Sequence, residues 1–178
     1  MTDIQKEIVK LIHFMLNSEY FRNNYASPGL KDIISQAIRQ YPEITTDKKR
    51  TWKNVEMYLA HLKISERAEK VITENPHEEE LWKLLHYEHI EPVSVTLNRL
   101  IELGGSPSLN DVREVMFDCE VFILSKEEAN VLDGSKTSRY ELDGELVLGK
   151  GMRASGTKEE RLSAVGIRIA ESYKNNKL

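Results

Sequence analysis

The chain of 178 residues has one cysteine, Cys119. A single cysteine excludes an internal disulfide and any zinc site built from several cysteines. The chain also lacks an apolar run approaching the ~18 residues that a membrane-spanning helix needs. Its first 16 residues mix acidic and basic side chains and lead to no small-residue cleavage site, unlike a secretion signal. We therefore expect a soluble protein of a reducing cytoplasm, with no membrane partner.

The sequence has no excess of positive charge, because 25 Lys and Arg stand against 29 Asp and Glu, a formal charge of −4. This balance argues against a protein that coats nucleic acid through bulk positive charge. It leaves room for a local basic groove, since the distribution of charge matters more than its sum. The basic clusters are 47-DKKRTWK-53 and a spaced set near the C-terminus, and both are typical of solvated faces. The spaced set is Lys150, Arg153, Lys158, Arg161 and Arg168.

The first 83 residues are dominated by apolar side chains at intervals of three and four, which predicts a run of helices. Residues 4–16 form the first stripe. Ser27 and Pro28 are typical of the start of a second helix, and Pro42 of its end. The predicted helices are 4–16, 27–42, about 47–62, one opened by Ser65, and 77–85.

The remainder mixes strands with helices. The pattern predicts a strand over 119–125, followed by a helix over 126–132 that Ser125 and Glu128 cap. Asp143-Gly144 indicates a hairpin turn, and a final amphipathic helix is predicted on 157-TKEERLSAVGIRIAESY-173, capped by Thr157 and Glu160. The expected fold class is α+β, mostly α: a helical region over 1–83, then a small ββα-type unit over 84–178 with a C-terminal hairpin and helix. The other expected elements are a strand at 86–92, helices at 93–105 and 106–118, and a flexible loop at 149–156.

The stretch 84-LLHYEHIEPVS-94 has two interpretations. It fits a strand that carries His86 and His89, but 77–91 could also be one amphipathic helix that Pro92 ends. In the second interpretation both histidines are exposed or lie at the edge of a core. The downstream strand and capped helix favour the first interpretation, because they supply a partner strand and a helix for a two-strand, one-helix unit.

The residues 88-EHIEP-92 are similar to the signature that opens the site of the HNH, or His-Me finger, nucleases. The resemblance covers about residues 88–133, without the zinc-binding cysteine pairs that many members carry. It implies a ββα fold that holds one divalent cation. It also implies that His89 is the general base and Glu88 a metal ligand, with Glu128 or Asn130 on the following helix as the second ligand.

The same resemblance implies a residue that orients the base and residues that meet a phosphate. Asn110 is the nearest match to the orienting asparagine, with Asn98 a weaker one. Arg139 or Arg113 would contact the phosphate. Carboxylate and amide oxygens suit a hard ion such as Mg²⁺ or Mn²⁺, and a neutral imidazole can accept a proton from water near pH 7.

The function that follows from the resemblance is a metal-dependent endonuclease acting on DNA, with genome defence as a further expectation. The alternative is a non-catalytic α-rich interaction protein, such as an antitoxin, a nuclease inhibitor or an adaptor. The excess of acidic residues over 118–146 could then mimic nucleic acid toward a basic partner. In either case the N-terminal helices could bind a protein partner, and a homo-oligomer remains open. A helix-turn-helix over 27–62 is the least supported alternative.

Overall fold

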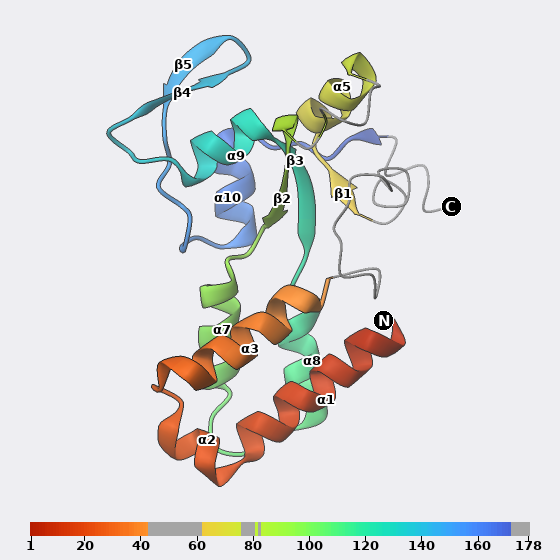
Figure 1. Ribbon diagram of the computed structural model, residues 1–178, viewed down its shortest axis with the longest axis vertical. Coiled ribbons are helices and arrows are strands. Elements are labelled where there is room, and N and C mark those ends of the chain that lie inside the picture. The colour runs from red at the N-terminus through yellow and green to blue at the C-terminus, as the bar shows by residue number, and fades with distance from the viewer. Residues whose placement is uncertain (43–61, 76–80, 82, 172–178) are drawn as a thin grey trace. The chain divides into compact units, whose positions relative to one another are not determined.

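The computed structural model describes residues 1–42, 62–75, 81 and 83–171 (Figure 1). Most of the predicted helix at 47–62 and the beginning of the one at 77–85 lie outside these ranges. Within them the chain forms eight helices and five short strands, which confirms an α+β protein that is mostly α. No helix in the described ranges is long and apolar enough to cross a membrane.

The chain divides into two compact units, each built from two separate stretches of sequence. Unit 1 comprises residues 1–43 and 91–120, and unit 2 comprises residues 44–90 and 121–178. Residues 91–120 therefore form an insertion into the sequence of unit 2. The two units do not coincide with the ranges 1–83 and 84–178, and separate functions for those two ranges stay a prediction.

All the described secondary-structure elements of unit 1 are helices. Its helices are α1 (Asp3–Asn17), α2 (Glu19–Asn24), α3 (Pro28–Gln40), α7 (Val93–Glu102) and α8 (Leu109–Phe117). Thr2 and Ser108 close capping boxes at the starts of α1 and α8, which satisfies amide donors that no helical carbonyl can reach. The apolar stripes of these helices meet in one core that includes Ile12, Ile34, Ile38, Leu100 and Met116.

Unit 2 contains a three-stranded sheet of order β1-β3-β2, with β1 (Lys63–Ile64), β2 (Leu85–His89) and β3 (Val121–Ser125). The central strand β3 runs parallel to β1 and antiparallel to β2 (Figure 1). All five residues of β3 are buried, as its β-branched and aromatic sequence predicts. The alternative of one helix over 77–91 is wrong, since residues 85–89 pair with β3. The strand β1 was not expected.

The other elements of unit 2 are α5 (Glu66–Glu74), α9 (Lys126–Asp133), the hairpin of β4 (Arg139–Leu142) and β5 (Glu145–Leu148), and α10 (Lys158–Val165). Ser65 caps α5, and Ser125 with Glu128 forms the predicted capping box of α9. The final helix is shorter than its apolar pattern suggested. Gly166 takes a left-handed conformation with φ 63° and ends α10, after which Ile169 bridges to Ser65.

The two faces of the sheet carry different cores. Leu85 and Tyr87 of β2 pack in a cluster with residues of β1 and α5. Phe122 and Leu124 of β3 pack instead with α9, α10 and the hairpin. Successive side chains of a strand point to opposite faces. Because Phe122 is opposite Glu88 and Leu124 is opposite His86, these two residues of β2 share the face that α9 covers.

Candidate functional site

The strand pair and helix that the ββα resemblance implies are present in unit 2. Leu85 to His89 pair with Ser125 to Val121 in antiparallel register, and α9 begins directly after β3. Ser125 is both the last residue of β3 and the cap of α9, so the helix folds back over the strands at once. α9 contacts both β2 and β3. The backbone thus brings one face of β2 against a helix rich in polar side chains.

The two histidines of β2 lie on different faces. His86 and Glu88 lie on the face that α9 covers, and the imidazole Nε2 of His86 is 3.1 Å from Oε2 of Glu88. Alternation along the strand assigns His89 to the other face, together with Leu85 and Tyr87. His89 is opposite Val121, at the end of the ladder remote from the start of α9. The histidine beside α9 is therefore His86, and the role of His89 as general base stays a prediction.

A buried arginine holds Glu88 in place. Arg161 of α10 has a fully buried side chain, and its Nη2 donates to Glu88 Oε1 at 2.6 Å and to Asp133 Oδ1 at 3.3 Å. Its Nη1 donates to the carbonyl oxygens of Met152 and Ser155. Burial and the neighbouring Glu88 raise the pKa of Asp133, while Arg161 opposes that rise. Glu88 therefore connects a half-buried imidazole to a buried guanidinium.

A cleft of about 270 Å³ lies beside this network and follows one face of α9. The α9 residues that line it are Lys126, Ala129, Asn130 and Asp133, a spacing of three and four that keeps them on one helical face. His86 borders it from β2, Tyr140 from the hairpin and Arg153 from the loop after β5. Every lining residue belongs to unit 2. The cleft thus combines an imidazole held by a carboxylate with two cationic side chains.

The second predicted ligand on α9 belongs to a different network. Glu128 is fully buried, and its Oε2 accepts from the hydroxyl of Ser65 at 2.5 Å and from the amide of Ser125 at 2.9 Å. Its Oε1 accepts from Arg67 at 3.2 Å. Arg67 also binds both carboxylate oxygens of Asp143 at the tip of the hairpin. Glu128 thus links α9 to Ser65 after β1, to Arg67 of α5 and, through Arg67, to the hairpin.

The donor atoms expected to hold a metal ion are therefore engaged elsewhere. Glu88 accepts from Arg161, Glu128 accepts from Ser65 and Arg67, and the two carboxylates share no partner among the residues that the structure describes. Among the described residues no group of three or more His, Cys, Asp or Glu is arranged to hold a cation. In this arrangement Glu88, Glu128 and Asn130 do not fit one metal site, and the divalent cation stays a prediction.

Apart from Asn130, the remaining predicted site residues do not line the cleft. Asn110 and Arg113 are exposed on α8 of unit 1, where the Asn110 amide donates to Glu114 at 2.8 Å. Asn98, the weaker candidate, is exposed on α7 of the same unit. Arg139 begins β4, is exposed and does not line the cleft. Of the predicted set, Asn130 lines the cleft, and Glu88 contacts His86, which also lines it.

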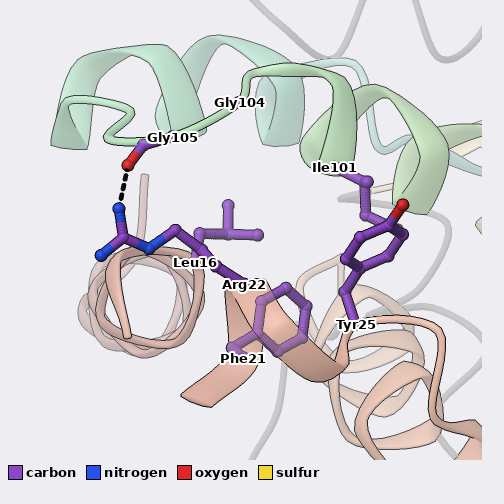
Figure 2. A pocket seen from close by; sticks show the side chains of 7 residues that line it. All are labelled: Leu16, Phe21, Arg22, Tyr25, Ile101, Gly104 and Gly105. Carbon is purple, nitrogen blue, oxygen red and sulfur yellow. Dashed lines mark hydrogen bonds between the residues drawn. The ribbon is translucent and has the colours of Figure 1, made fainter. Parts of the chain in front are cut away.

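A second cavity, of about 280 Å³, lies in unit 1 between α1, α2 and the end of α7 (Figure 2). Leu16, Phe21, Tyr25 and Ile101 give it apolar walls. Arg22 crosses to the opposite side and donates to the carbonyl of Gly105 at 2.6 Å, as the dashed line in Figure 2 shows. This cavity offers apolar surface and one cation already bonded to the backbone, and it holds no acid–base pair.

Two residues of the cleft network, His86 and Arg161, were not predicted from the sequence to be site residues. His86 had a signal, because two strand residues separated by one position share a face and so His86 and Glu88 form a pair. Arg161 had none, since an arginine in an amphipathic helix is ordinarily solvated.

Comparison of the chain with protein-family models, curated proteins and solved structures finds no match.

Proposed function

We propose that the protein hydrolyses phosphodiester bonds of DNA in the cleft along α9, with His86 as the general base. The observation that carries the proposal is the 3.1 Å contact between His86 Nε2 and Glu88 Oε2, on the face of β2 that α9 covers. A base oriented by a carboxylate, itself held by a third group, is the arrangement that activates water or a hydroxyl in many hydrolytic sites. Lys126 and Arg153 in the same cleft suit a phosphate substrate.

The roles of these residues follow from their hydrogen bonds. When His86 donates its Nε2–H to Glu88, Nδ1 carries the lone pair that can accept a proton from water. The water oxygen then forms a bond to phosphorus, and the bond from phosphorus to the leaving oxygen breaks with its electron pair on that oxygen. Arg161 orients the carboxylate of Glu88 through a hydrogen bond of 2.6 Å, so that carboxylate can hold the imidazole in one tautomer. The cations of the cleft offset charge on the phosphate oxygens.

The test is nicking of supercoiled plasmid DNA by the full chain, with Mg²⁺ or Mn²⁺ present because the HNH resemblance implies a cation. Loss of a positioned general base costs typically 10²–10⁴-fold in rate, so His86→Ala should lower nicking by about that factor. His89→Ala should retain most of the activity, and His13→Ala in unit 1 serves as a matched control.

Each other outcome has a defined meaning. If His89→Ala abolishes nicking while His86→Ala does not, the base is the histidine of the Glu-His-Ile-x-Pro motif, and the assignment to His86 is wrong. If the wild-type chain does not nick DNA with either ion, the hydrolase proposal fails. Circular dichroism of every variant must match the wild type, so that a lost fold is not mistaken for a lost base.

A second candidate, binding of a protein partner through unit 1, is favoured by a different observation. Several large apolar side chains of this unit are exposed, with Phe14 at 73%, Tyr20 at 71% and Phe117 at 77%. Aromatic side chains are enriched at protein–protein interfaces. The acidic segment proposed to mimic nucleic acid supports this candidate less. Four of its eight carboxylates form ion pairs with arginines of the chain: Asp118, Glu128, Asp133 and Asp143.

A gel-filtration and light-scattering comparison tests this candidate without a nuclease assay. If unit 1 binds a second copy, Phe14→Glu or Phe117→Glu should lower the mass of the particle. A wild-type chain that is monomeric at high concentration would exclude self-association through these side chains.

A further inference from the structure

The loop at 149–156, expected to be flexible, is fastened to the end of α9. The amide of Lys150 donates to the carbonyl of Val131 at 2.7 Å, that of Gly151 to Gly134 at 2.7 Å, and that of Met152 to Leu132 at 2.9 Å. The last carbonyls of a helix have no partner inside the helix, and the loop amides satisfy them here. The loop therefore has a defined path over the C-terminal end of α9.

The same loop is fixed from its other side by Arg161. The buried guanidinium donates to the carbonyls of Met152 and Ser155, the residues that bracket Arg153 in the sequence. Gly149 passes so close to the backbone of Gly134 and Ser135 that a Cβ at this position would overlap them. Arg153 therefore borders the cleft on a short segment whose backbone is hydrogen-bonded to the end of α9 and to the guanidinium of Arg161.

We infer that the cleft along α9 binds a phosphate group through Arg153 and Lys126. This inference rests on the proposed function for its ligand class, because a phosphodiester substrate would bring a phosphate to the cleft. The guanidinium of Arg153 offers parallel donors that match two phosphate oxygens, and Lys126 adds a point charge from the first turn of α9.

The charges around the cleft favour an anion. Arg153, Lys126 and the buried Arg161 contribute three positive charges, against the carboxylates of Glu88 and Asp133. Asp133 lines the cleft and shares the single guanidinium of Arg161 with Glu88, so the three cations exceed the two carboxylates by one positive charge.

The size of the cleft limits the ligand. Its volume of about 270 Å³ lies just below the ~300–1,000 Å³ typical of pockets for drug-sized ligands. It suits one phosphate with the sugar attached to it. Asn130 and Tyr140 line the same cleft and offer an amide and a phenol to a sugar hydroxyl or a base edge.

Isothermal titration of the full chain with inorganic phosphate, in a buffer free of other polyvalent anions, tests the inference. We expect saturable binding that Arg153→Ala weakens at least tenfold and Lys126→Ala severalfold. Arg168→Ala is the matched control, because Arg168 is an exposed arginine of unit 2 that pairs with Glu66 outside the cleft. That variant should bind phosphate as the wild type does.

The opposite results overturn the inference. Absence of saturable phosphate binding by the wild type would do so. Equal weakening by Arg153→Ala and Arg168→Ala would also do so, since it indicates a diffuse charge effect. Thymidine 5′-monophosphate should compete with phosphate, and competition by thymidine itself would show recognition of sugar or base in place of phosphate.

The outcome is separable from that of the proposed hydrolysis. Phosphate binding that depends on Arg153, in a chain that does not nick DNA, retains this site and refutes the hydrolase. Nicking that depends on His86, without any phosphate binding, retains the hydrolase and refutes this site.

Discussion

Replacement of Arg161 by methionine probes the network on which the candidate site depends. The guanidinium is fully buried, and it is paired with Glu88 at 2.6 Å and with Asp133 at 3.3 Å. Methionine replaces the apolar stem of the arginine with a side chain of similar length, but it leaves the buried carboxylate of Glu88 without its cation. Removing one partner of a buried ion pair costs about 3–5 kcal/mol, because the remaining charge stays desolvated.

This cost translates into a large thermal shift. For a chain of 150–250 residues each kcal/mol lowers the melting temperature by roughly 2–4 °C, so Arg161→Met should lower it by roughly 6–20 °C. The Met152 and Ser155 carbonyls also lose their donor, which adds to the loss. The measurement is urea denaturation and thermal melting followed by circular dichroism. Arg168→Ala, an exposed arginine, should change stability by no more than about 0.5 kcal/mol.

A double substitution separates the charge effect from lost packing. Glu88→Gln removes the buried negative charge, so the pair Glu88→Gln and Arg161→Met should cost less than the sum of the single changes. A loss below about 1 kcal/mol for Arg161→Met would refute the reasoning, because it would mean that the Glu88 carboxylate is not left buried without a partner.

Three other predictions concern single side chains. The raised pKa of Asp133 means that its contribution to stability is present below the ordinary value of 3.8 and is lost as pH rises through the higher folded value. Asp133→Asn should therefore flatten the decline of stability above pH 3.8 in urea titrations, and an unchanged slope would contradict this. Asp143 has φ 53° and binds Arg67, so Asp143→Ala should cost about 1–3 kcal/mol, whereas Asp143→Asn, which tolerates that φ, should cost at most ~1 kcal/mol. Equal costs would show that the turn conformation carries no strain. Burial raises the pKa of Cys119 to about 12, so iodoacetamide at pH 8 should label it only after denaturation, and rapid labelling of the native chain would show that unit 1 opens.

Local chemistry explains why the elements were predicted better than their assembly. Ser65, Ser108, Ser125 and Thr157 each cap the helix that follows, and a cap needs only a side chain and an amide three residues away. The hairpin turn is also local, because it needs only the positive φ angles of Asp143 and Gly144. The end of α10 was predicted too late because its apolar pattern continues past Gly166, into a segment that pairs with Ser65.

The candidate site depends on contacts between residues far apart in the sequence. Glu88 was expected to hold a cation, yet its partner is Arg161, 73 residues away. Glu128 was expected to hold the same cation, and it binds Ser65 and Arg67 instead. The resemblance implied that both carboxylates are metal ligands, but no spacing in the sequence indicates which cation approaches them.

The sequence by itself determined most of the described helices, the strand β3 and the capped helix α9, and it favoured a strand at β2, since periodicity, caps and turn residues act within a few positions. It also determined that His86 and Glu88 share a face if β2 is a strand. The tertiary structure decided which face α9 covers, and so which histidine borders a cleft. It brought the buried cation Arg161 to the carboxylate Glu88, because only the folded core can join a guanidinium to a carboxylate 73 residues away.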